Sequence, residues 1–358
     1  MIALLAIGIA CVLVGGPPTA AQTPPREADK IWPYLAGLSA EQRRTVMERE
    51  ALREGGLVLY GATGIDRAGF WIGEFNKRHP QTKVEFVRLQ AGELYEKIAT
   101  ERRTGRIRAD LVITTITYVE LLAAVNAFAP YETIHWPDFE PRFKLGSAMK
   151  GWTAVVYEIF PHAFAWRSDR ITDAAAPKSF AQLADLTWKG RVGTTTHLED
   201  FLNGAFTVLG EDKGRALAKS LGVLNNRLYR SHAALSDALA AGQVDLAWGL
   251  VAGRPIELKA KGAPVAWNLG DPQFAEGNTI SIGRDTEKPY AAALFLDVML
   301  SADTLQASDA WQGGRIFGNR KGKYALSLDQ YPSLFIFPAL SRERYRELNR
   351  LAEEIFVR

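Results

Sequence analysis

Residues 55–64 read GGLVLYGATG, a short apolar run with glycines on both sides. Such a run predicts a buried strand followed by a turn. An amphipathic helix over residues 68–79, a strand over 84–87, a helix beginning at Gly92 and a strand over 109–114 follow in turn. Three strands separated by two helices predict a βαβαβ unit, and therefore a parallel sheet with right-handed crossovers.

A second set of alternating elements occupies the middle of the chain. Strands are predicted over residues 154–157, 163–166, 191–193, 227–229, 244–248 and 265–269, with helices between most of them. The expected fold class is therefore α/β with two units. The length of 358 residues supports this division, because a single compact domain of that size is unusual.

The composition narrows the classes of function. Lys and Arg number 43 against 40 Asp and Glu, and this balance of +3 is too even to indicate a nucleic-acid-binding protein. The single cysteine excludes an intrachain disulfide and a cysteine-based zinc cluster. A basic run at residues 102–108 is more typical of a solvated helix end, because it contains no aromatic residue for base stacking.

The first residues are typical of an export signal. Residues 2–15 form an almost unbroken apolar run, shorter than the roughly 20 residues that span a bilayer. The small residues that follow predict cleavage after residue 21, and hence a periplasmic mature protein. Cys11 lies inside this segment, and a lipid anchor on it would require a large aliphatic residue where Gly8 stands.

No arrangement typical of catalysis occurs in the sequence. It contains no Gly-x-Ser-x-Gly motif, no P-loop and no Gly-x-Gly-x-x-Gly fingerprint. The five histidines are scattered, and none lies four residues from another, which excludes a helical zinc-binding pair. We therefore predict no catalytic residue, no cofactor and no metal. His197 and His232 each follow a predicted strand, where a pocket role and a structural role are equally compatible with the sequence.

Small, hydroxylated turns follow the predicted strands. Ligands of open α/β sheets bind beyond the carboxyl ends of the strands, where helix N-termini offer free N–H groups. Each hydroxyl alone is typical of a helix cap, but their repetition in both halves predicts a solute-binding cleft. Trp248 adds a flat apolar face, and Arg254 adds a guanidinium fork unless it is a surface helix residue. The candidate binding residues are Thr63, Gly64, Gly92, Glu93, Thr114, Thr115, Tyr157, Thr195, Thr196, Ser231, Trp248 and Arg254.

Several stretches resemble one protein family. Most specific is PKSFAQLADLTWKGRV at residues 177–192, which is similar to a Pro-Lys-Thr-aromatic segment ending in Trp-Lys-Gly-basic-Ile in bacterial extracellular solute-binding proteins. The other matching stretches are 54–63, 75–80, 84–88, 259–265 and 291–301. Together they span most of the chain after the predicted signal. The branch that the chain resembles is the iron(III)-type binding proteins of ABC importers.

The resemblance implies a type 2 periplasmic-binding-protein fold, in which two lobes, each a mainly parallel sheet flanked by helices, close like a hinge on a solute. It also implies a monomer that performs no covalent chemistry and delivers its solute to an ABC permease at the inner membrane. Two crossover strands are expected near residues 153–157 and 265–269. The expected division is a signal peptide at 1–21, a helical extension at 22–54, lobe one at 55–152 and 270–358, and lobe two at 153–269.

One departure from the family pattern bears on the solute. Ferric-iron binders of this branch carry adjacent tyrosines after the strand that here ends at Trp248, whereas this chain continues with residues 249–252, GLVA. Ferric iron prefers hard oxygen donors. Tyr60, Tyr118 and Tyr157 are equally compatible with phenolate ligands and with core aromatics. Because the adjacent tyrosines are missing and Trp248 and Arg254 offer a flat face and a guanidinium fork, a small organic anion is the favoured solute. Ferric iron binding, a ligand-sensing module for a membrane receptor and an enzyme on the same scaffold are the alternatives.

Overall fold

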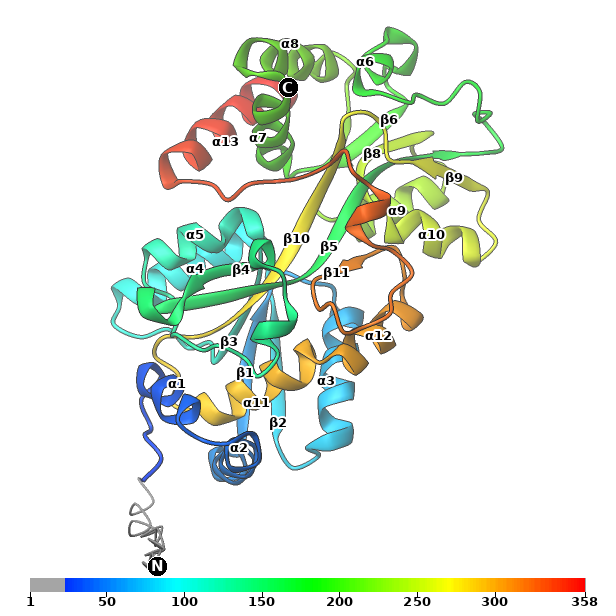
Figure 1. Cartoon of the computed structure of the whole chain (residues 1–358). Coiled ribbons are helices and arrows are strands. Elements are labelled where there is room, and N and C mark those ends of the chain that lie inside the picture. Colours follow the sequence, from blue (N-terminus) through cyan, green and yellow to red (C-terminus); the bar gives the residue numbers. More distant parts are fainter. Residues whose placement is uncertain (1–22, 358) are drawn as a thin grey trace, which may run out of the picture.

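The computed structural model describes residues 23–357, which form two α/β lobes joined by long strands (Figure 1). The predicted fold class is confirmed. The predicted signal peptide and Cys11 lie outside the described residues. Among the helices of residues 23–357, none is both long and apolar enough to span a membrane.

The first lobe is built around the βαβαβ unit that the sequence predicts. Strand β1 pairs in parallel with β2 on one side and with β3 on the other. Helices cover this sheet, so the side chains of β3 are buried throughout. The strands of this lobe are β1 (Gly56–Gly61), β2 (Lys83–Arg88), β3 (Leu111–Thr115), β4 (Lys144–Ser147) and β11 (Ile316–Phe317). Its helices are α1 (Ala28–Ala36), α2 (Ala40–Glu54), α3 (Ile65–Arg78), α4 (Ala91–Arg103), α5 (Ile116–Ala124), α11 (Pro289–Leu300) and α12 (Ala302–Trp311), with short 3-10 turns at Trp136–Asp138, Pro141–Phe143, Ala148–Lys150 and Leu328–Gln330.

The second lobe repeats the pattern of a parallel sheet between helices. Strand β6 pairs in parallel with β7 and with β8. The strands are β6 (Val192–Thr195), β7 (Arg227–Tyr229), β8 (Leu246–Val251) and β9 (Val265–Asn268). The helices are α6 (Phe180–Leu183), α7 (Leu198–Leu209), α8 (Glu211–Gly222), α9 (His232–Ala240), α10 (Gly253–Ala260) and α13 (Arg342–Phe356), with a 3-10 turn at Leu186–Trp188.

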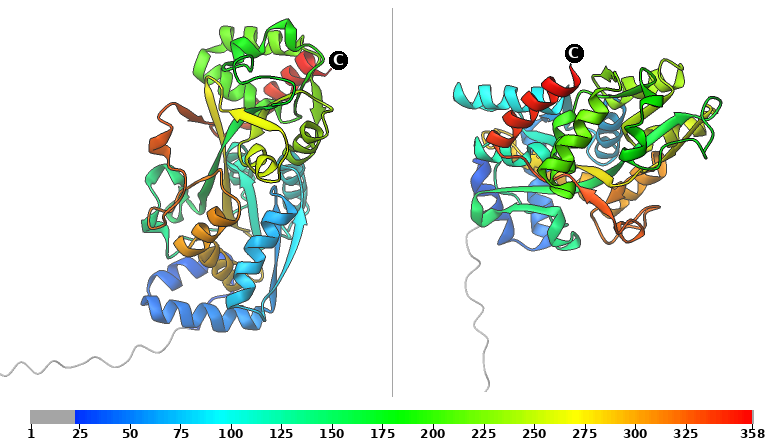
Figure 2. Two further views of the ribbon diagram at one scale, coloured as in Figure 1. Left: turned by 90° about the vertical axis from the view of Figure 1, so that its right-hand side faces the viewer. Right: turned by 90° about the horizontal axis from the view of Figure 1, so that it is seen from above.

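Two long antiparallel strands connect the lobes, β5 (Trp152–Arg167) and β10 (Gln273–Ile282). Strand β10 also pairs with β3 of the first lobe, and β5 pairs with β8 of the second, both in antiparallel fashion. The strand order is therefore β2-β1-β3-β10-β5-β8-β6-β7. The two strands predicted at 154–157 and 163–166 are one continuous strand, which passes from one lobe into the other (Figure 2).

The second crossing differs from the expected one. The strand predicted at 265–269 is β9, an edge strand that pairs only with the second-lobe part of β5. The strand that crosses is β10, whose sequence QFAEGNTISI does not have the apolar pattern of a strand. Glu276 and Asn278 interrupt that pattern, and both line the space between the lobes.

The C-terminal helix also lies elsewhere than expected. The sequence places all of residues 270–358 in the first lobe, but α13 packs on α7 and α8 of the second lobe (Figure 1). The helix is amphipathic, and Leu348, Leu351 and Ile355 form one core cluster with Leu202 of α7. The short strand β12 (Leu334–Ile336) pairs with β10 and leads the chain across to this lobe.

The residues before β1 form two helices at the end of the first lobe remote from the second (Figures 1 and 2). Helix α2 begins at the predicted capping box, in which Ser39 and Gln42 satisfy each other's backbone N–H. It packs on α11, and buried Arg43 donates to the Tyr131 hydroxyl at 2.8 Å and forms an ion pair with Asp297. This extension therefore supports the first lobe and lies far from the space between the lobes.

Candidate functional site

A cavity of about 780 Å³ lies between the lobes. From the first lobe it is lined by the turn after β1, by residue 88 at the end of β2, by residues 90 and 91 after it, and by Thr115 at the end of β3. The second lobe contributes the turns after β6, β7 and β8, and the crossing strands β5 and β10 contribute side chains between them. The cavity thus collects the carboxyl ends of the parallel strands of both lobes, which is where α/β sheets bind ligands.

A buried network of Arg67, Glu158 and Arg315, here called the arginine network, forms one side of this cavity. Arg67 of α3 forms an ion pair with Glu158 of β5, and its Nε lies 3.3 Å from Glu158 Oε1. The Nε of Arg315 lies 3.2 Å from Glu158 Oε2. Asn278 of β10 donates to Glu158 Oε1 at 2.8 Å. One fully buried carboxylate therefore serves two guanidinium groups.

The arginine network stays charged at neutral pH. Burial by itself raises the pKa of Glu158, but Arg67 and Arg315 outweigh it and hold the pKa below its ordinary value. Burial lowers the pKa of Arg315 to about 10, which leaves its guanidinium protonated near pH 7. Two positive groups around one negative group leave one positive charge in excess within this network.

A second network consists of His197, which lines the cavity, and of the buried residues Glu199 and Tyr118, and is here called the histidine network. His197 Nδ1 lies 3.8 Å from Glu199 Oε1, and Tyr118 of α5 donates to the same oxygen at 2.7 Å. Burial lowers the pKa of His197, but Glu199, Asp200 and Glu276 more than offset this and raise it to about 9. Burial raises the pKa of Glu199, which His197 and Tyr118 bring below its ordinary value. His197 and Glu199 thus form a pair of opposite charges.

Arg254 reaches the cavity from the second lobe at the start of α10. The preceding strand β8 contains Gly249 with a φ of 68°, which is in the left-handed region that favours glycine. The pairing of β5 with β8 shifts register near this point, as at a β-bulge. A Cβ placed on Gly64 of the first lobe would lie 3.8 Å from Arg254 Nη2, so this guanidinium spans the gap between the lobes.

Hydrogen bonds join the lobes around the cavity. Gln90 Nε2 of the first lobe donates to the carbonyl of Arg230 in the second at 2.6 Å. Gln312 Nε2 donates to Glu257 Oε2 of α10 at 3.3 Å. Together with the Tyr118 contact, these bonds join the two lobes directly.

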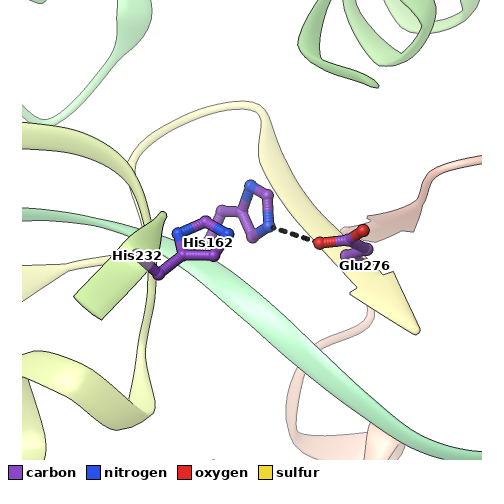
Figure 3. A group of neighbouring side chains, drawn as sticks. All are labelled: His162, His232 and Glu276. Carbon is purple, nitrogen blue, oxygen red and sulfur yellow. Dashed lines mark ion pairs between the residues drawn. The ribbon is translucent and has the colours of Figure 1, made fainter. Parts of the chain in front are cut away.

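Three side chains could hold a metal ion. They lie where the cavity adjoins a second, much smaller recess. One nitrogen of His162, one nitrogen of His232 and one carboxylate oxygen of Glu276 lie within 4.8 Å of one another (Figure 3). His162 belongs to β5, His232 is the first residue of α9, and Glu276 belongs to β10.

The structure brings only some of the sequence-predicted residues to the cavity. Thr63, Gly64, Thr115, Ser231 and Arg254 line it, and their contact with a solute stays a prediction. Two others line the separate recess of about 20 Å³, which contacts the core of the second lobe. These are Thr195 and Trp248.

The remaining candidates line neither space. Glu93 completes the capping box of α4 by accepting from the backbone of Gln90, next to Gly92. Tyr157 is fully buried and lies edge-on against Trp71 in the first-lobe core. The carbonyl of Thr114 accepts from Thr279 Oγ1 across β3 and β10, which is a ladder position. Thr196 is exposed, and its N–H donates to the carbonyl of Tyr229. The geometry therefore gives these residues structural positions.

Sequence reasoning missed the charged residues of the crossing strands. Glu158 stands inside the otherwise apolar run of β5, and an isolated charge in a buried strand is the signal that could have found it, whereas Glu276 lies in the polar sequence of β10, which was not predicted as a strand. Arg67 and Arg315 carried no comparable signal, because each lies at an element end where exposed arginines are common. Trp248, expected as a ligand surface, is buried in the second-lobe core and donates to Asn226 Oδ1 at 2.7 Å.

Comparison with known proteins identifies the family of this chain. The family model described as "Bacterial extracellular solute-binding protein" matches residues 68–306. A probable ABC transporter periplasmic-binding protein of Sinorhizobium fredii is 27% identical over 268 residues, which cover 70% of this chain and 71% of the relative.

Solved structures share the fold. The substrate-binding protein of an ABC transporter from Agrobacterium tumefaciens gives a TM-score of 0.73 at 18% identity, over 85% of this chain and 96% of that one. Iron-bound HitA from Pseudomonas aeruginosa gives a TM-score of 0.71 at 18% identity, over 84% of this chain and 99% of that one. At these identities the two likenesses establish the architecture and leave the solute open.

Proposed function

This chain belongs to the family of bacterial extracellular solute-binding proteins, and from that premise we propose that its interlobe cavity captures a small organic anion and delivers it to the permease of an ABC importer. The protein acts in the periplasm as a monomer after removal of its signal peptide. It binds its solute by charge and hydrogen bonds and does not convert it.

The observation that carries this proposal is the sharing of one carboxylate by two guanidinium groups. Glu158 neutralises only one of Arg67 and Arg315, and all three line the cavity. In a partly desolvated site, a surplus guanidinium strongly attracts a negative solute, and its planar fork suits carboxylate and phosphonate groups. Arg254 approaches from the other lobe, so a bound anion would be contacted from both sides.

The placement of the tyrosines favours an organic anion over ferric iron. Among the described residues, no tyrosine lines the cavity. Tyr157 lies in the first-lobe core, Tyr118 donates to Glu199, and Tyr60 donates to Glu101 Oε1 at 3.0 Å. A hard trivalent ion would lack the phenolate donors that suit it.

Isothermal titration calorimetry tests the proposal. The purified protein is titrated with a panel of di- and tricarboxylates and phosphonates, with ferric citrate and a polyamine as comparisons. We expect one organic anion to bind with a Kd of roughly micromolar or tighter, and Arg315→Gln to weaken it. Tight iron binding with a visible charge-transfer band, or binding of the polyamine alone, would overturn the proposed solute class.

A further inference from the structure

The cluster of His162, His232 and Glu276 is assembled by the topology of the crossing strands. In the antiparallel pair of β5 and β10, Glu276 lies opposite Phe160. His162 follows Phe160 by two residues, so strand alternation places it on the same face, diagonal to Glu276. The rings of Phe160 and His162 lie 6.5 Å apart and nearly parallel, as this arrangement requires. His232 completes the cluster from the start of α9, and its ring centroid lies 5.6 Å from that of His162.

The polar atoms of this cluster lack ordinary partners. Within residues 23–357, His162 Nε2 and His232 Nδ1 are buried and find no hydrogen-bond partner. The distance from His162 Nε2 to Glu276 Oε2 is 3.7 Å, too long for a hydrogen bond (Figure 3). The side chains of His162 and Glu276 are 14% and 10% exposed. Leaving such groups unsatisfied costs free energy, and a ligand that engages all of them would recover it.

We propose that His162, His232 and Glu276 form a binding site for a divalent first-row transition metal ion. Two imidazoles and one carboxylate are a donor set that suits Zn²⁺ and its neighbours in the series, and one that Mg²⁺ and Ca²⁺ do not prefer. Donor atoms around a tetrahedral Zn²⁺ lie about 3.4 Å from one another. The 3.7 Å between His162 and Glu276 is close to this value, and the donor atom of His232, within 4.8 Å of both, would need a small side-chain rotation to complete the site.

The surroundings suit a metal site. Phe337 packs edge-on against His162 at 5.3 Å and Phe160 flanks it on the strand, so one side of the site is apolar. His232 and Glu276 line the interlobe cavity, whereas His162 lines the recess behind it. An apolar shell on one side and access from the cavity on the other are features of metal sites that exchange their ion. The site lies beside the arginine network and does not depend on the proposed anion.

The test is metal titration of the purified, chelator-treated protein. We expect one Zn²⁺ per chain by calorimetry, and Co²⁺ to give the visible ligand-field absorption of a tetrahedral site. Each of His162→Asn, His232→Asn and Glu276→Gln should weaken Zn²⁺ binding at least roughly tenfold, because each removes one of three protein ligands. Thermal unfolding in EDTA checks that each variant folds, and Zn²⁺ should raise the Tm of the wild type more than that of any of these three variants.

His79→Asn is the matched control, because His79 lies at the end of α3 outside the cluster. This variant should bind Zn²⁺ as tightly as the wild type. The proposal is overturned if the wild type shows no stoichiometric Zn²⁺ binding at micromolar concentrations. It is equally overturned if His232→Asn binds as tightly as wild type, or if Mg²⁺ competes at equal concentration. Titration with organic acids in EDTA measures the anion separately, so failure of one proposal leaves the other standing.

Discussion

The arginine network and the histidine network each contain a buried carboxylate, but they neutralise its charge in different ways. In the arginine network, Glu158 is held by two guanidinium groups that carry their charge at every physiological pH. In the histidine network, Glu199 is held by one imidazolium and one neutral hydroxyl. The first arrangement leaves an excess of positive charge, and the second is neutral as a pair.

Under the proposed function, this difference assigns separate tasks to the two networks. The arginine network supplies a positive charge that attracts the proposed anion. The histidine network joins α5 of the first lobe to α7 of the second, and its charge depends on a proton. The arginine network therefore supplies affinity, and the histidine network supplies a contact between the lobes that depends on pH.

The largest effect should follow from removing the shared carboxylate. Glu158→Gln leaves two buried guanidinium groups without a counter-charge, and arginine cannot release its proton to escape. We expect a loss of about 3–5 kcal/mol in the free energy of unfolding, measured by urea denaturation. Glu199→Gln should cost clearly less, because His197 can become neutral. An equal loss in the two variants would show that the networks do not differ as described.

The second largest effect should be on the affinity for the solute, to which Arg315 should contribute more than Arg254. Arg315→Gln should weaken anion binding roughly 30- to 100-fold, because a buried charge-assisted hydrogen bond contributes about 2–3 kcal/mol. Arg254→Gln should cost only about 5- to 10-fold, since Arg254 is less buried and also pairs with Glu257. Calorimetry with the same anion measures both. Arg315→Lys keeps the charge but loses the fork, and should fall between wild type and Arg315→Gln.

The pH dependence of stability should report the histidine network. A pKa of His197 raised from 6.5 to about 9 means that its stabilising contribution is complete below about pH 6.5 and is lost as the pH rises through 9. We expect the wild type to lose roughly 1–2 kcal/mol more than His197→Gln between these limits, measured by urea denaturation in EDTA. The charged or titratable groups facing His197 are Glu199 and Asp200 on α7, Glu276 on β10 and His232 on α9. Parallel profiles for the two proteins would contradict this assignment.

The smallest effect concerns the hydrogen bonds at the rim. Gln90→Ala removes the bond to the Arg230 carbonyl, which is exposed and therefore contributes under about 1 kcal/mol. The affinity for the solute should fall roughly two- to fivefold, with an unchanged free energy of unfolding. Gln312→Ala removes the bond to Glu257 and also the long contact in which Gln312 Oε1 accepts from Arg67 at 3.5 Å, so its loss of affinity should be at the upper end of this range. If either variant lost more affinity than Arg254→Gln, the hydrogen bonds between the lobes, and not the arginine side chains, would contribute most of the binding energy.

The sequence predicts the scaffold better than the site, for physical reasons. The apolar periodicity of β1, α3, β2, α4 and β3 reflects local burial, which a single sequence displays directly. The strand-end rule also finds Thr63, Thr115 and Ser231, because their position follows from chain order. By contrast, β10 contains polar residues that face the cavity, so its sequence lacks the apolar pattern by which a core strand is recognised.

Residues that depend on tertiary contact cannot be read from spacing. His162, His232 and Glu276 come from three separate elements, so the spacing of the histidines along the sequence carries no signal of this cluster. Trp248 was predicted to contact the solute but lies in the core, since an aromatic residue at a strand end is compatible with either position. Only the packing of Phe201 and Phe180 against its ring decides between them.

The segment that carries the chain to α13 adds a third connection between the lobes. Leu340 N–H donates to the carbonyl of Thr117 in the first lobe, and Asn203 of the second lobe donates to the carbonyl of Pro338. Two strands side by side form a joint that can bend and also twist, whereas a third segment that leaves β10 after Phe337 and bonds to both lobes opposes the twist. We therefore expect any hinge motion to follow a narrower arc, so that the residues of the two lobes meet in the same register.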